Sequence, residues 1–163
     1  MKTNIIHPSF KHGISFEIGN FCIIEEDVVV GDNVKIENYV LLKSGTVIGD
    51  NTFIDSYVRS SGDNLIGNDC TIRYGATIAK EVEIHNEVFI SPNVMTIYSD
   101  PKGTSNKTIS MHTVIHNGVY IGTSAIIGKC VEIYSDITVG AMSYVKESLF
   151  ISGTYVGVPA KLL

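Results

Sequence analysis

Three of the five histidines lie on either side of one polar segment, and they are the residues best suited to acid–base chemistry. His85 precedes the segment, while His112 and His116 follow it. An imidazole changes charge near neutral pH, so it can take a proton from an attacking amine or hydroxyl group. We predict His85 as the general base, His116 as the second candidate, and His112 as a residue that positions the segment. The alternative, a turn histidine that faces water, stays open for each of them.

The polar segment, over residues 97–108, is predicted to be a loop. From Tyr98 to Lys107 it contains glycine and proline but no aliphatic residue that could enter a core. Such a stretch favours a loop, and loops on rigid scaffolds often carry binding chemistry. Asp100 is a candidate to recognise a protonated amino group or to orient a base. A tolerated insertion at a solvated corner is the alternative.

A strict six-residue repeat of aliphatic residues organises the rest of the chain. The first series runs from Ile18 to Thr96, and only Ser60 and Thr96 in it are not aliphatic. After a slip of one residue, a second series runs from Ile109 to Ile151 without exception. Neither an ordinary strand nor a helix has this period. The repeat predicts a short inward-facing strand and a turn, three times per coil, with about seven coils stacked as parallel strands.

Composition agrees with an all-β protein that forms a single domain over residues 1–163. The chain has 23 isoleucines and 17 valines but only 6 leucines, and β-branched side chains fit pleated strands better than helices. The net charge of −5 comes without any basic cluster, which argues against a nucleic-acid surface. No apolar run is long enough to span a bilayer, and the first residues lack the apolar core of a signal peptide. We therefore expect no membrane partner.

The cysteines and the histidines give no metal-site spacing. Cys22, Cys70 and Cys130 form no Cys-x-x-Cys pair, and three thiols without an export signal are typical of a reducing compartment. We therefore predict a cytoplasmic protein that holds no metal.

Residues 18 apart should lie above one another in such a stack of coils. By this rule His85 shares a corner with five glycines, which are Gly31, Gly49, Gly67 and, after the slip, Gly122 and Gly140. Glycine at a corner indicates a positive φ or close packing, so a histidine there marks a coil where something favours an imidazole. By the same rule His116 falls in a mixed column with Glu25, Lys43, Ser61, Ala79, Tyr134 and Ser152.

The repeat resembles that of the hexapeptide-repeat acyltransferases, whose fold is a left-handed parallel β-helix. The resemblance runs from about Ile18 to Lys161. Within the tail of residues 152–163, the run from Val156 to Lys161 is similar to the terminal signature of acetyl-CoA-dependent members. The run from Phe89 to Val94 is similar to the segment before the acceptor loop of sugar acetyltransferases. The resemblance implies acetyl-CoA as acyl donor, a sugar or nucleotide-sugar acceptor, and a homotrimer with sites between subunits.

The resemblance also implies particular binding residues. Thr123 and Ala141 match small residues whose backbone contacts the pantetheine of coenzyme A, and their spacing of 18 should stack them vertically. Lys146 and Lys161 would meet the phosphates as point charges. Asn93 matches an asparagine that contacts the acceptor, and its amide can both donate and accept. A solvated lysine and an asparagine in a tight turn are the alternatives.

One departure from the family bears on the acceptor. Asp100-Pro101 stands where galactoside and maltose O-acetyltransferases carry their catalytic histidine. An amine loses its proton more readily than a hydroxyl, so this departure favours N-acetylation. We predict acetyl transfer to the amine of a nucleotide-linked amino sugar by direct attack on the thioester.

Three other functions stay open at this point. The first is O-acetylation of a sugar or an antibiotic. The second is a zinc enzyme like the gamma-class carbonic anhydrases, with His85, His112 and His116 as ligands. The third is a non-catalytic β-helical scaffold.

Overall fold

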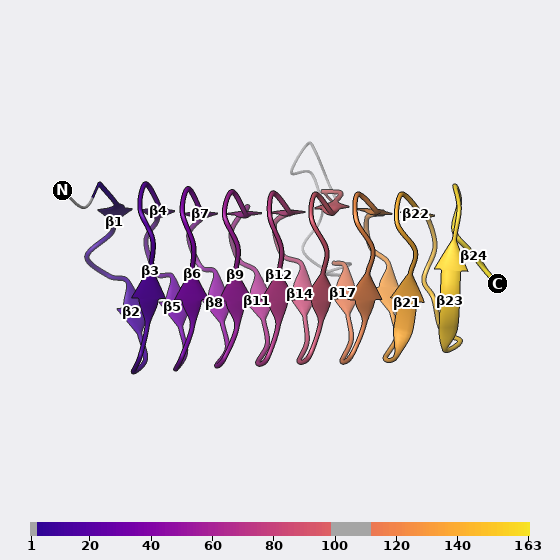
Figure 1. Ribbon diagram of the computed structural model, residues 1–163, viewed down its shortest axis with the longest axis horizontal. Helices are drawn as coiled ribbons and strands as arrows, with labels where there is room; N and C mark the ends of the chain where they lie inside the picture. Colours follow the sequence, from indigo (N-terminus) through magenta and orange to yellow (C-terminus); the bar gives the residue numbers. More distant parts are fainter. Residues whose placement is uncertain (1–2, 99–111) are drawn as a thin grey trace, which may run out of the picture.

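The protein is a parallel β-helix of about eight turns (Figure 1). The computed structural model describes residues 3–98 and 112–163, which form 24 short strands. Within those two ranges there is no helix, and hence none that could cross a membrane. Asp100 and most of the predicted loop lie outside the described residues. The fold class predicted from the repeat is confirmed.

Three sheets form the faces of the β-helix. Sheet A contains β1 (Ile5–Ile6), β4 (Ile23–Ile24), β7 (Leu41–Leu42), β10 (Arg59–Ser60), β13 (Thr77–Ile78), β16 (Met95–Thr96), β19 (Ile126–Ile127) and β22 (Tyr144–Val145). Sheet B contains β2 (Lys11–His12), β5 (Val29–Val30), β8 (Val47–Ile48), β11 (Leu65–Ile66), β14 (Glu83–Ile84), β17 (Val114–Ile115) and β20 (Glu132–Ile133). Sheet C contains β3 (Glu17–Ile18), β6 (Lys35–Ile36), β9 (Phe53–Ile54), β12 (Thr71–Ile72), β15 (Phe89–Ile90), β18 (Tyr120–Ile121), β21 (Ile137–Val139), β23 (Gly153–Val156) and β24 (Lys161–Leu162).

The turns between these faces form three corners, which we call the A–B, B–C and C–A corners. Each coil passes through them in that order. All strand pairs are parallel except the last, in which β24 pairs antiparallel with β23 at the C-terminal end.

The core is a ladder built from the second residue of each strand. Ile24, Ile48 and Ile72 are fully buried, as are the corresponding residues of the following coils. The residue four positions later, such as Val28 or Cys70, fills the corner next to them. Two details differ from the prediction. The helix has one more coil than expected because residues 5–18 already form strands, and Ile151 is 64% exposed, so it lies outside the ladder.

Where the ladder admits a polar residue, that residue is paired. Ser60 is buried, and its hydroxyl lies 2.6 Å from Thr46 Oγ1 and donates to Asn64 Oδ1 at 2.7 Å. The Asn64 amide donates in turn to the carbonyl of Ala79 at 2.6 Å. Since each buried polar group has a partner, the interruption costs little stability.

The insertion changes the stacking register in a way that the sequence pattern did not predict. β16 belongs to sheet A and β17 to sheet B, and Ile84 pairs with Ile115 rather than with a residue 18 positions on. The stack therefore continues from β16 on sheet A to β17 on sheet B, the next face in the coil order. The prediction of a one-residue slip is wrong, because it shifts every later residue onto a neighbouring corner.

Candidate functional site

In the first four coils, the B–C corner is held by a repeated hydrogen bond between coils. Asp50 N donates to Asn68 Oδ1 at 2.7 Å, and Asn68 N donates to Asn86 Oδ1 at 2.8 Å. This side chain lies over the glycine of the coil below. A Cβ atom on Gly67 would sit 2.5 Å from Asn86 Oδ1 and 2.7 Å from a backbone carbon. Close approach therefore explains the glycines of this column, whose φ angles are not positive.

The next two coils place histidines at this glycine position. Because Ile84 pairs with Ile115, His85 and His116 stack directly upon one another. Their ring centroids are 4.8 Å apart, at an interplanar angle of 79°. The hydrogen bond from Asn86 N to Asn117 Oδ1 lengthens to 3.0 Å. The coil after them has Tyr134 at the same position, so three consecutive coils depart from the glycine rule.

This register corrects the predicted columns. Gly122 and Gly140 lie at the C–A corner, after sheet C, and not above His85. His116 belongs to the glycine column rather than to the mixed column, from which only Tyr134 is its true neighbour. The His116 and Tyr134 rings are 4.8 Å apart.

Two glutamates from sheet B complete the group. Glu83 Oε1 lies 3.0 Å from His112 Nε2, and its Oε2 lies 3.8 Å from His85 Nε2. Glu132 Oε2 lies 3.7 Å from His116 Nε2. We call these five residues the histidine cluster: Glu83, His85, His112, His116 and Glu132.

Sequence reasoning missed both glutamates. They occupy the outward position of β14 and β20, on either side of Val114. Only the correct register across the insertion could have revealed that they share a column.

One atom of the cluster lacks a partner. His116 Nε2 is shielded from solvent and makes no hydrogen bond. A buried polar nitrogen without a partner is costly, and Glu132 at 3.7 Å is just beyond hydrogen-bond distance. A small rotation of Glu132, or a bound molecule, would satisfy the ring.

Among the residues that the structure describes, nothing marks the histidine cluster as a metal site. Within the described ranges 3–98 and 112–163, no group of three or more His, Cys, Asp or Glu side chains is arranged to hold a metal ion. The zinc ligand set of His85, His112 and His116 therefore gains no support from this geometry.

The residues predicted to bind coenzyme A lie at two separate locations. Thr123 and Ala141 stack at the C–A corner, as predicted, because Ile121 pairs with Val139. A Cβ atom on Gly122 would lie 2.5 Å from the Ala141 nitrogen, so the backbones of these two coils pack closely here. Lys146 and Lys161 instead line a cavity of about 340 Å³ at the C-terminal end, together with Leu149, Tyr155 and Ala160.

Asn93 is also at the C–A corner. It is exposed, adopts a φ of 59°, and follows Pro92, whose carbonyl accepts a hydrogen bond from Ser124 N at 3.0 Å. It therefore shares a corner with Thr123 but not with the histidine cluster. Neighbouring corners of one coil are six residues apart, or at most about 20 Å of extended chain.

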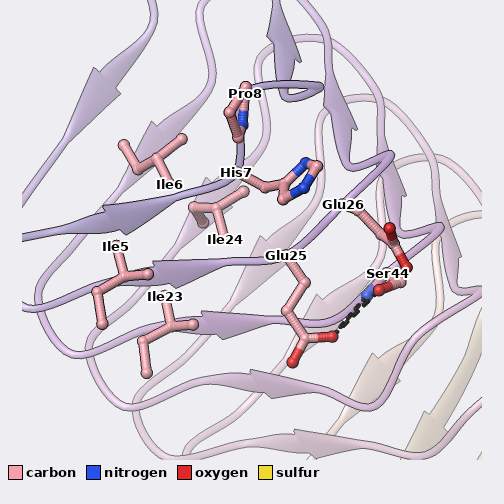
Figure 2. A pocket seen from close by; sticks show the side chains of 9 residues that line it. All are labelled: Ile5, Ile6, His7, Pro8, Ile23, Ile24, Glu25, Glu26 and Ser44. Carbon is pink, nitrogen blue, oxygen red and sulfur yellow. Dashed lines mark hydrogen bonds between the residues drawn. The ribbon is translucent and has the colours of Figure 1, made fainter.

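A further cavity of about 420 Å³ lies between the first coils, far from the predicted site residues (Figure 2). Its apolar side is formed by four isoleucines, Ile5, Ile6, Ile23 and Ile24. On its polar side, Glu25 Oε2 accepts hydrogen bonds from the Ser44 amide and hydroxyl, both at 3.2 Å (Figure 2).

The fold and the repeat define a hexapeptide-repeat β-helix protein. The family model described as the GMPPB C-terminal domain matches residues 1–110, about two thirds of the chain. The chain belongs to this family. No curated protein sequence gives a significant match.

Solved structures show the same left-handed β-helix over nearly the whole chain. A UDP-N-acetylglucosamine acyltransferase from Campylobacter jejuni aligns with a TM-score of 0.71 at 18% identity, over 97% of this chain and 71% of its own. The acetyltransferase domain of PglB from Neisseria gonorrhoeae aligns with a TM-score of 0.50 at 21% identity, over 98% of this chain and 57% of its own. A mutant GDP-perosamine N-acetyltransferase from Caulobacter crescentus, solved with CoA and GDP-perosamine, aligns with a TM-score of 0.53 at 21% identity. The alignment covers 98% of this chain and 56% of that protein. This chain thus spans little more than half of two of these proteins, and the likeness shows the fold.

Proposed function

We propose that the protein is an acetyl-CoA-dependent N-acetyltransferase that acts on the amine of a nucleotide-linked amino sugar. The observation that carries this proposal is the edge-to-face pair of histidines, His85 and His116, at a corner where the preceding coils have glycine. Two imidazoles with carboxylate neighbours are suited to accept a proton during acyl transfer.

The proposed reaction is a direct attack. The acceptor nitrogen attacks the thioester carbonyl carbon, and the histidine pair takes the proton that the nitrogen loses. The carbon–sulfur bond then breaks, and the thiolate of coenzyme A leaves with that proton. Glu83 and Glu132 stabilise the imidazolium that forms in between. Proximity of the two substrates supplies much of the rate.

The residues expected to hold acetyl-CoA suit that role. Thr123 and Ala141 are small, exposed residues that stack at the C–A corner, which fits a narrow pantetheine arm. Lys146 and Lys161 line one cavity together with Glu147, and the two cations could meet phosphate groups there. The Caulobacter relative with CoA and GDP-perosamine supports this choice of substrates.

The proposed site joins two copies of the chain. The histidine cluster lies at the B–C corner, whereas Asn93, Thr123 and Ala141 lie at the C–A corner of the same coils. We propose a homotrimer in which one subunit's B–C corner faces its neighbour's C–A corner, in keeping with closed cyclic symmetry. The cytoplasmic location stays a prediction.

An acceptor screen tests the proposal. Release of free thiol from acetyl-CoA would be measured with UDP-, dTDP- and GDP-linked amino sugars. We expect turnover with at least one of them, loss of turnover in His85→Gly and His116→Gly, and full activity in His7→Ala, which lies outside the cluster. Binding of acetyl-CoA without turnover of any acceptor would overturn the proposal and favour a non-catalytic β-helix.

A further inference from the structure

We propose that Tyr120 on sheet C is a further acceptor-binding residue, and that the sugar ring of the acceptor lies on the free face of its phenol ring. This inference rests on the proposed function. It gives the sugar of that acceptor a place on the chain, which the sequence pattern did not indicate.

The Tyr120 hydroxyl is held in place by a buried serine. Ser91 is 2% exposed, and its hydroxyl donates to the Tyr120 hydroxyl oxygen at 3.2 Å. Tyr120 accepts this bond, so its own O–H is left to donate outward, and the residue is 45% exposed. Tyr39 and Tyr57 are exposed to the same extent, but within the described residues the structure gives their hydroxyls no hydrogen-bond partner. The Tyr120 ring is therefore presented to solvent with its polar end fixed.

Tyr120 is also the last ring of a column on sheet C. It stacks on Phe89 of the coil below, with ring centroids 5.2 Å apart and an interplanar angle of 9°. In the coils above, the same column has Thr138 and then Thr154. Coils are about 4.8 Å apart, so the change from a ring to threonine leaves a step on the free face of Tyr120. We call Phe89, Ser91, Tyr120 and Thr138 the Tyr120 ledge.

Such a step suits a sugar ring. One face of a sugar ring carries C–H groups that pack on an aromatic ring, while the hydroxyl groups at its rim need polar partners. The Tyr120 O–H and the half-buried Thr138 hydroxyl offer those partners on the ledge. A purely apolar ligand would remove both from water without replacing their hydrogen bonds.

The chain leaves the face of this ring open, whereas it covers a ring of an earlier coil. Phe53, in the same column, has Lys35 Nζ 5.9 Å and the Arg73 guanidinium 5.8 Å from its centroid. Ser91 takes the position of Arg73 one coil later and replaces the cation with a small hydroxyl. Among the described residues, no lysine or arginine lies over Tyr120. Its free face is thus left for a ligand.

The Tyr120 ledge adjoins residues already expected to bind the substrates. Ser91 precedes Asn93 by two residues, and Tyr120 precedes Thr123 by three, or at most about 7 and 11 Å of extended chain. The Tyr120 hydroxyl reaches Ser91, so the ring extends along sheet C toward the C–A corner. In the proposed homotrimer this corner faces the histidine cluster of the neighbouring subunit. A sugar on the ledge then lies between the acyl donor and the proposed base.

Filling the ledge is the sharpest test. Thr138→Phe adds one ring to the column above Tyr120 and should raise KM for the acceptor about tenfold or more, with KM for acetyl-CoA unchanged. The melting temperature should not fall, because aromatic pairs across strands are favourable. Thr71→Phe is the matched control, since it adds a ring to the same column on the other side of Phe89 and should change neither KM. The acceptor used is the UDP-, dTDP- or GDP-linked amino sugar that the acceptor screen identifies.

Removing the phenol hydroxyl is the milder test. Tyr120→Phe keeps the ring and should raise KM for the acceptor about three- to tenfold. Ser91→Ala acts only through Tyr120, so it should raise the same KM less and have no further effect in the Tyr120→Phe background. The inhibition constant of the free nucleoside diphosphate should stay constant throughout, because the ledge binds the sugar.

Each other outcome has a defined meaning. An acceptor KM that is equal in wild type, Thr138→Phe and Tyr120→Phe would overturn the inference and leave the proposed function intact. A higher KM for acetyl-CoA, or a higher inhibition constant of the nucleoside diphosphate, in Thr138→Phe would also overturn it. If none of the three nucleotide-linked amino sugars is turned over, the proposed function fails, and calorimetric binding of each decides the inference. Weaker binding to Thr138→Phe than to Thr71→Phe supports it, and equal binding or none overturns it.

Discussion

The B–C corner has the same backbone path in the early and the middle coils but different side chains. Below β14 it carries glycine at each coil, and an aspartate or asparagine from the coil above packs over that glycine. At β14 and β17 the glycine becomes His85 and His116, and the hydrogen bond between coils lengthens to 3.0 Å. The early coils thus show what close packing requires at this corner, and His85, His116 and Tyr134 show where the chain departs from it.

The largest effect on activity is expected when His85 is replaced by the glycine that the earlier coils have at this position. His85→Gly restores the glycine of the earlier coils, so the melting temperature should be equal to or above that of wild type. Loss of a general base should lower kcat about 10²- to 10⁴-fold. Steady-state kinetics and thermal denaturation on the same samples check both parts. Unchanged kcat would remove His85 as the base, and a larger loss in His116→Gly would reverse their ranking.

The reverse change should break the scaffold. In Gly67→Ala, the new Cβ would meet the backbone and Asn86 Oδ1 of the coil above. Overpacking against backbone should reduce the free energy of unfolding by about 1–3 kcal/mol. Urea denaturation measures this change. The control is Ser61→Ala at the A–B corner, which should have little effect on the free energy of unfolding. Gly45→Ala is not suitable as a control, because Gly45 has a positive φ of 73°. A stable Gly67→Ala protein would contradict the packing explanation of the column.

A smaller effect, on KM for acetyl-CoA, is expected when the lysines of the C-terminal cavity are removed. Lys146→Ala and Lys161→Ala remove cations from the C-terminal cavity. Each should raise KM for acetyl-CoA about three- to tenfold and leave kcat nearly unchanged, since the lysines lie away from the histidine cluster. Lys35→Ala on sheet C is the matched control. An equal effect of all three substitutions would show only a general loss of positive charge.

The smallest effect concerns the pH dependence of stability, and it comes from Cys70 in the core. Burial raises the pKa of the Cys70 thiol above 9.0, so the folded chain keeps its proton where the unfolded chain loses it. This contribution to stability is complete below pH 9 and is lost as the pH rises through the folded-state pKa. Urea denaturation from pH 7 to pH 10 should show a decline that is smaller in Cys70→Val, which carries the valine found at this position in other coils. An identical decline in both proteins would contradict the assignment.

Much of the fold could be predicted because the repeat is local. Each aliphatic residue at the second strand position had only to turn inward, as Ile24, Ile48 and Ile72 do. The stacking of Thr123 on Ala141 was predicted correctly for the same reason, since no insertion separates their coils. The candidate site was predicted less well. His85 and His116 were both singled out, but their contact was not, and Glu83 and Glu132 looked like any outward-facing strand glutamate.

The sequence by itself determined which residues face inward and where the regular pattern stops, because these follow from side-chain shape within six residues. Only the tertiary structure decided which corner each later residue occupies. The number of residues between β16 and β17 does not by itself state which face of the helix β17 belongs to. Packing of Ile115 on Ile84 makes that choice. It brings two histidines together at one corner and separates them from the residues expected to hold coenzyme A.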